Sequence, residues 1–187
     1  MGITSSLFPE ENCNPELNCD EISNGGSPEI PDENLDNVAF YAATLSVPAR
    51  RDFDNEEVLQ GKELFNSINC SGCHIATFET GAYAIDALAN QTIRPYTDLL
   101  LHDMGDALSD GAPEFRATGN EWRTPPLWGV GLIETVNDHT NLLHDGRARN
   151  IEEAILWHGG EAEAIKNSFM ALNKEERTKI IAFIETL

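Results

Sequence analysis

The sequence predicts an all-α fold in which helices are joined by long loops. Apolar residues recur at helical spacing in four segments, residues 32–45, 55–66, 151–158 and 174–187. The chain has 187 residues, of which 41% are apolar, and this is enough for a real core. Residues 75–121 carry only weak turn signals, which predict mostly loop.

The first part of the chain is expected to be irregular up to a single helix. Residues 1–31 are rich in Asn, Pro, Glu, Ser and Gly and show no periodicity. The helix expected over 32–45 begins with Asp32 as its cap and ends near the sequence SVP. Its apolar residues are Leu35, Val38, Ala39, Ala42 and Leu45.

The other three helices frame the remaining chain. The helix over 55–66 delivers the chain to the sequence NCSGCH at 69–74. The helix IEEAILWH at 151–158 is capped by Asn150, and two glycines stop it. The last helix runs from about residue 174 to the C-terminus. Between these helices, the prolines and aromatic residues of EWRTPPLWGVG at 121–131 predict an extended segment.

A weak internal repeat suggests two domains. VAFYAATL at 38–45 echoes IIAFIETL at 180–187, and each is a helix at the end of an acidic segment. We therefore interpret residues 1–50 as the tail of a preceding domain and residues 51–187 as a second domain. The alternative is that any two amphipathic helices resemble each other over eight residues.

The charge of the chain limits its partners. It contains 12 basic and 32 acidic residues, with a formal net charge of −20, which repels nucleic acid and anionic lipid. A basic partner protein fits this charge, and a surface that is merely well solvated fits it equally. The sequence contains no run of eighteen apolar residues, so no membrane span is expected.

The sequence NCSGCH contains the pattern CysXxxXxxCysHis, formed by Cys70, Cys73 and His74. Two thiols three positions apart can reach the two vinyl groups at one edge of a porphyrin, and the adjacent histidine can bind the iron. The pattern therefore predicts one covalently bound haem c with His74 as an axial ligand.

Two other chemistries compete for this motif. A zinc site could recruit Cys13 and Cys19, but it would leave His74 unused, and the spacing of Cys13 and Cys19 is longer than in a zinc knuckle. A thioredoxin-like pair needs a strand before the motif and a long helix after it, whereas here a helix precedes and a loop follows. We expect Cys13 and Cys19 to form a disulfide, with free thiols or metal ligands as the alternatives.

The start of the chain lacks the basic and apolar regions of a signal peptide. Covalent haem is attached after export, so we expect a periplasmic or otherwise exported protein. The signal then lies upstream, or this chain is a processed piece.

Several separated motifs give the sequence a family resemblance. GKELFNSINCSGCH at 61–74, RTPPLWG at 123–129, LHDGRARNIEEAI at 143–155 and the closing helix together resemble the C-terminal haem domain of bacterial di-haem cytochrome c peroxidases and MauG. LLLHDMG at 99–105 and ILWHGGEAEA at 155–164 are most similar to the di-haem oxidoreductase subgroup, also called thiol oxidoreductase-like.

The resemblance implies a cytochrome c-like helical domain with long loops around the haem. It also implies that residues 1–50 are the end of a preceding haem domain, which becomes a partner of this one. A calcium ion between the two domains is a further implied feature, with no ligands that we can assign in this sequence.

The second axial ligand is assigned mainly by the resemblance. His158 follows His144 of the HDG turn by fourteen residues, where the related peroxidases place Met and MauG places Tyr. The residues themselves agree, because the glycines after His158 have no side chains and would let a porphyrin come close. Met104 is the alternative ligand, followed by His102 or an open site.

Two imidazole ligands close both faces of the iron and favour its ferric state. The resemblance then implies the electron-transfer half of a di-haem oxidoreductase. The alternatives are a peroxidatic enzyme that reduces hydrogen peroxide at a switchable distal site, and a binding module without redox activity. Arg123, Arg147 and Arg149 are candidates for pairing with haem propionates, with ordinary surface ion pairs as the alternative.

Overall fold

A computed structural model of the chain describes residues 3–10 and 23–187. The chain divides into two compact units, Met1–Ser46 and Val47–Leu187. Cys13 and Cys19, with the disulfide expected between them, lie outside the described residues. In the part of the chain that is described, no helix is long and apolar enough to cross a membrane.

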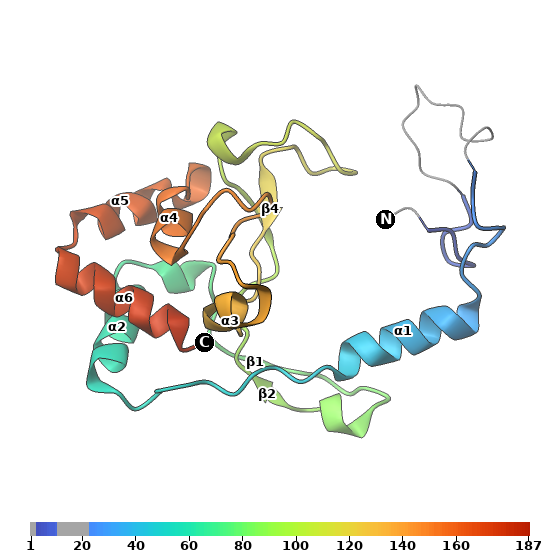
Figure 1. Cartoon of the computed structure of the whole chain (residues 1–187), viewed down its shortest axis with the longest axis horizontal. Helices are drawn as coiled ribbons and strands as arrows, with labels where there is room; N and C mark the ends of the chain where they lie inside the picture. Colours follow the sequence, from blue (N-terminus) through green and yellow to red (C-terminus); the bar gives the residue numbers. More distant parts are fainter. Residues whose placement is uncertain (1–2, 11–22) are drawn as a thin grey trace. The chain divides into compact units, whose positions relative to one another are not determined.

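In the described residues of the first unit there is one helix, α1 (Asp32–Thr44) (Figure 1). No residue of α1 is buried. The expected cap at Asp32 is wrong, because Pro31 occupies the cap position and its carbonyl oxygen accepts the amides of Asn34 and Leu35. Asp32 and Glu33 lie in the first helical turn, where their charges interact favourably with the helix dipole.

The second unit is built on the contact between α2 (Glu56–Ser67) and α6 (Lys174–Glu185). A Cβ atom on Gly61 of α2 would lie 1.9 Å from the carbonyl oxygen of Lys179, so the two backbones touch directly there. The core around this contact is completed by residues from the loops and from α5. Its buried members are Val58, Phe65, Tyr96, Phe169, Ile180, Phe183, Ile184 and Leu187.

The helices near the C-terminus pack beside α6 (Figure 1). α4 (Ile151–Leu156) is capped as expected by the side chain of Asn150, and Arg177 of α6 pairs with Glu152 of α4 at 3.4 Å. α5 (Glu163–Ala171) was not expected, although it buries Phe169 completely. α3 (Ile133–Asn137) is a further short helix. Single turns of 3-10 helix lie at Cys70–Gly72, Asp86–Leu88, Asp106–Leu108, Val130–Leu132 and Gly160–Ala162.

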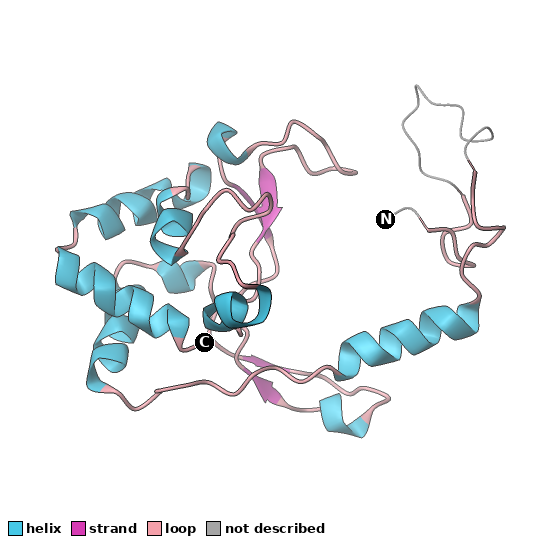
Figure 2. Cartoon of the chain, viewed as in Figure 1, coloured by secondary structure: helices cyan, strands magenta, loops and turns pink. Residues whose placement is uncertain are grey.

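The expected all-α class is only partly correct: the described residues are mainly helical, but they also form two small antiparallel sheets (Figure 2). β1 (Phe78–Glu79) pairs with β2 (Thr92–Ile93), and β3 (Leu101–Asp103) pairs with β4 (Glu121–Arg123). Strands of two or three residues are too short to produce a periodic sequence pattern, which explains why an all-α fold was expected. They satisfy backbone hydrogen bonds inside the long loops.

Candidate functional site

The CysXxxXxxCysHis motif forms one tight turn directly after α2. Asn69 adopts a left-handed conformation, with φ of 69°, which asparagine tolerates better than most residues. The turn Cys70–Gly72 follows, and the amide of His74 donates to the carbonyl oxygen of Cys70 at 3.0 Å. The end of α2 and this turn therefore hold both thiols and the imidazole on one short segment.

Both cysteines are free thiols and favour the protonated state. Burial raises the pKa of Cys70 to about 12. Burial also raises the pKa of Cys73, and the negative charges of Asp98 and Glu161 raise it further. Thiol–disulfide exchange needs a thiolate, so this environment disfavours the thioredoxin-like alternative.

His74 is a neutral imidazole with one nitrogen fixed. Its Nδ1 lies 2.9 Å from the carbonyl oxygen of Tyr96, which can only accept, so Nδ1 carries the proton. Burial lowers the pKa of His74, and the nearby His158 lowers it further. The lone pair of Nε2 is therefore the one left for a metal.

His158 follows the end of α4 and repeats this arrangement. Its Nδ1 lies 2.8 Å from the carbonyl oxygen of Ala154, one helical turn earlier. Burial lowers the pKa of His158, so this ring is also neutral, with Nε2 as its free lone pair. The two histidines predicted as axial ligands thus share one tautomer, and each is oriented by a backbone carbonyl group.

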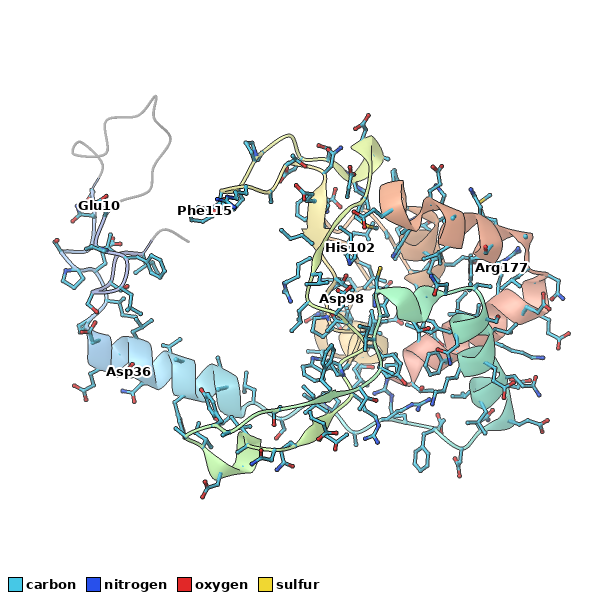
Figure 3. All side chains as sticks on the ribbon, turned by 180° about the vertical axis from the view of Figure 1, so that it is seen from behind. Glu10, Asp36, Asp98, His102, Phe115 and Arg177 are labelled. Carbon is cyan, nitrogen blue, oxygen red and sulfur yellow. The ribbon has the colours of Figure 1, made fainter. Side chains whose placement is uncertain are left out.

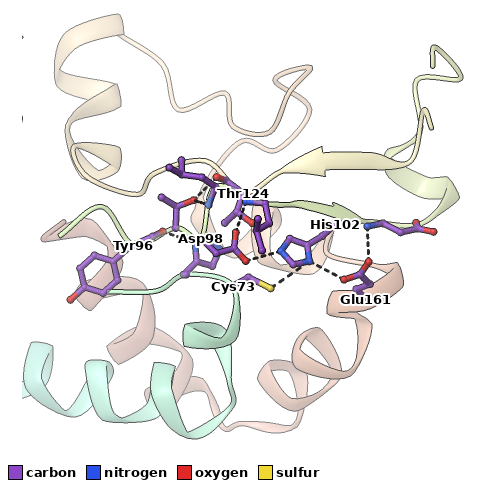
Figure 4. A network of polar contacts seen from close by, with 11 residues as sticks. Cys73, Tyr96, Asp98, His102, Thr124 and Glu161 are labelled. Atoms are coloured by element: carbon purple, nitrogen blue, oxygen red, sulfur yellow. Dashed lines mark hydrogen bonds and ion pairs between the residues drawn. The ribbon is translucent and has the colours of Figure 1, made fainter. Parts of the chain in front are cut away.

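A polar network adjoins Cys73 (Figure 4). The ring of His102 lies between two carboxylates, with Nε2 2.8 Å from Asp98 and Nδ1 2.8 Å from Glu161. Nδ1 also lies 4.0 Å from the sulfur of Cys73. Asp98 lies just before β3 and His102 lies within it, and their side chains lie close together (Figure 3). Sequence reasoning missed Asp98 and Glu161, because Glu161 reaches His102 across 59 residues of chain.

Cys73, Asp98 and His102 bring three donor atoms within 4.8 Å of one another. This grouping has the composition of a metal site. Both nitrogens of His102 are already engaged by carboxylates, and this arrangement disfavours metal binding there.

The glycines after His158 lie against the backbone of another segment. A Cβ atom on Gly159 would lie 2.7 Å from the carbonyl oxygen of Met104, and one on Gly160 would lie 2.2 Å from that of Asp103. The space beside these glycines is therefore filled by the backbone of the segment after β3. Met104 lies on that segment, and its role as alternative ligand stays a prediction.

The three arginines predicted to pair with haem propionates lie in β4 and in the loop before α4. Arg147 pairs with Asp145, and its guanidinium group lies 4.8 Å from the centre of the Trp157 ring. Arg149 pairs with Glu153. Arg123 is an exposed residue at the end of β4. Pairing of these arginines with propionates stays a prediction, and Arg147 and Arg149 already have carboxylate partners.

Apolar side chains next to these residues in the sequence are exposed. Ile75 follows the motif, Leu99 and Leu100 follow Asp98, and Leu156 and Trp157 precede His158; all are exposed. Two neutral thiols, two imidazoles with free Nε2 atoms and this apolar surface fit a haem. The donor set and the helical fold together define a haem-binding protein.

The comparisons place the chain in a particular family. A family model described as "Di-haem oxidoreductase, putative peroxidase" matches residues 1–187, so the chain belongs to the di-haem oxidoreductase family. This family is one of peroxidase-type oxidoreductases that bind haem. The resemblance seen in the sequence motifs is thereby confirmed.

A solved structure is also similar to this chain. Hydrazine synthase from Kuenenia stuttgartiensis, pressurized with xenon, matches with 17% sequence identity and a TM-score of 0.45. The match covers 77% of this chain and 52% of that chain, so this chain spans about half of its length. A comparison with curated proteins found no match.

Proposed function

We propose that residues 51–187 form a cytochrome c-like domain that transfers single electrons within a di-haem oxidoreductase. The proposed cofactor is one haem c, held by Cys70 and Cys73, with His74 and His158 as its axial ligands. When bound, this group accepts and donates one electron at its iron. The observation that carries the proposal is the matched state of His74 and His158, each neutral and each held by a carbonyl group through Nδ1.

The thiols are suited to covalent attachment. Thioether formation adds a thiol S–H across a vinyl double bond: sulfur bonds to one carbon and the proton goes to the other, with no net oxidation. Cys70 and Cys73 are free thiols, which matches this need. The proposed site has four bonds to the haem: two thioethers and two histidine–iron bonds. Because Cys70, Cys73 and His74 lie on one turn, a single segment would provide three of them.

The ligand set favours electron transfer over peroxide chemistry at this site. Two imidazoles favour ferric iron more than imidazole with thioether does, and they leave no position open to peroxide. The second candidate function is peroxide reduction here after His158 leaves the iron. The family description, a peroxidase-type oxidoreductase, supports this candidate.

The location and partners of the protein follow from the same proposal. Covalent haem attachment implies export to the periplasm or an equivalent compartment. The net charge of −20 suits a basic redox partner. Residues 1–50 would continue a preceding haem domain, and a calcium ion between the domains is implied only by the family resemblance.

Low-temperature EPR of the ferric protein tests the proposal in three forms: wild type, His158→Met and His139→Met. His139 is an exposed histidine and serves as the matched control. We expect a low-spin bis-imidazole signal that changes in His158→Met and not in His139→Met. A high-spin signal that His158→Met leaves unmoved would refute His158 as ligand and favour the peroxidatic alternative.

A further inference from the structure

The loop that carries His158 is restrained by its own helix only up to His158. α4 ends at Leu156, and the carbonyl oxygens of Ala154 and Ile155 in α4 hold the Nδ1 atom and the amide of His158. The next two residues, Gly159 and Gly160, have large backbone freedom, and Gly160 has a positive φ of 52°. The position of the loop beyond His158 therefore depends on what these glycines and Glu161 contact.

The contacts come from the segment that follows Asp98. Gly159 and Gly160 lie directly against the backbone of Asp103, Met104 and Gly105, with no room for a side chain between them. One residue later, Glu161 accepts the amide of Asp103 at 3.1 Å through Oε1 and meets His102 Nδ1 at 2.8 Å through Oε2. The sequences HDMG and HGGE thus dock against each other.

His102 connects the contact between HDMG and HGGE to the protein interior. Its other nitrogen lies 2.8 Å from Asp98, whose side chain is only 6% exposed and accepts the amide of Leu100 at 2.9 Å. The same ring lies 4.0 Å from the sulfur of Cys73. One imidazole therefore contacts the turn that carries His74 and the loop that carries His158.

We infer that Asp98, His102 and Glu161 form a clamp that keeps His158 on the iron. They are positioning residues: they touch the loop of the ligand and not the reacting atoms. The clamp sets how often His158 detaches, and so how far the site admits small external ligands. This inference rests on the proposed function, because it assumes that His158 is an axial ligand.

The test uses the full haem-loaded chain and carbon monoxide as the probe ligand. Carbon monoxide binds the ferrous protein only when a ligand has left, so its apparent affinity reports detachment of His158. Glu161→Gln removes the charge and keeps the shape. Glu163→Gln is the matched control, because Glu163 contacts only Lys166, at 3.7 Å, among the described ion pairs.

We expect Glu161→Gln to raise the affinity for carbon monoxide by about tenfold, a typical effect of losing one charge-assisted hydrogen bond. Glu163→Gln should match wild type. In a His158→Ala background, Glu161→Gln should add nothing, because the ligand it positions is gone. If Glu161→Gln retains no haem, Asp98→Asn is used in its place. This substitution removes the charge that faces the other nitrogen of His102, and it should give the same increase in the affinity for carbon monoxide.

The outcomes separate the two hypotheses. If His158→Ala leaves carbon monoxide affinity and the EPR signal at wild-type values, His158 is not the ligand and the proposed function fails. If His158→Ala raises the affinity while Glu161→Gln and Asp98→Asn behave like Glu163→Gln, the ligand assignment stands and the clamp is refuted.

Discussion

The imidazole of His144 stacks on the indole of Trp122, with ring centroids 3.6 Å apart and planes inclined by 11°. The indole is fixed in turn, because its Nε1 donates to the carbonyl oxygen of Leu108 at 3.0 Å. The histidine of the HDG turn is therefore a packing residue that joins its turn to β4.

Replacing His144 tests this packing role. We expect His144→Ala to lower the free energy of unfolding by about 1 kcal/mol, the usual value of an aromatic pair. His144→Phe should recover most of the loss, and both variants should keep the wild-type EPR signal. Urea unfolding and EPR of the same samples check this. A changed low-spin signal in His144→Ala would make His144 a ligand and contradict the assignment.

The contact between α2 and α6 depends on the absence of a side chain at Gly61. A Cβ atom there would meet the backbone of Lys179 at 1.9 Å, so the helices must separate in Gly61→Ala. We expect a loss of about 3 kcal/mol in stability, as in other overpacked cores. Gly81→Ala is the control, since nothing lies within 4 Å of its added Cβ, and it should match wild type or exceed it slightly. Equal denaturation midpoints for the two variants would contradict this packing.

The sequence predicted the elements with long periodic patterns or caps. Asn150 was correctly identified as a cap, and the helix expected over 55–66 is α2 to within one residue at each end. The helix α5 was missed even though Phe169 lies in the core. The caps and turns that marked the other helices are polar signals of short range, whereas the position of Phe169 is decided by tertiary packing.

The candidate site likewise contains residues that the sequence identified and residues that it did not. Cys70, Cys73 and His74 are adjacent and form a local motif, so sequence alone identified them as a group. Asp98 and Glu161 join His102 only in the folded chain. The contact of Gly159 with the Met104 backbone was missed, because the two residues are 55 positions apart in sequence.

The polar network around His102 should make stability depend on pH. Hydrogen bonds to Glu161 and Asp98 raise the pKa of His102 above 6.5. The stability that protonated His102 adds to the fold is therefore complete below pH 6.5, and it is lost as pH rises through the raised pKa. Glu161 behaves oppositely: the hydrogen bonds from His102 and Asp103 lower its pKa below 4.5, and its contribution is lost as pH falls through the lowered value. Burial alone would raise the pKa of Asp98, but its hydrogen bonds lower it below 3.8.

The stabilisation by this network is therefore greatest between pH 4.5 and 6.5. Urea unfolding of wild type and His102→Gln, measured within this window and well above it, checks the sign. We expect the free energy of unfolding of wild type to exceed that of His102→Gln most strongly inside this window. The difference should become smaller at alkaline pH. A difference that becomes larger at alkaline pH would show that His102 acts as a neutral residue.

The last prediction concerns the attachment of haem to the two thiols. Cys70 and Cys73 each carry a free thiol, so each can form its own thioether without the other. We expect Cys70→Ala and Cys73→Ala each to retain one covalent bond, and the double variant to retain none. Denaturing gels stained for haem and pyridine haemochrome spectra distinguish two, one and no thioethers. Cys13→Ala is the control and should keep both bonds, whereas loss of the bound group in Cys13→Ala would favour a metal site that includes Cys13 over haem attachment.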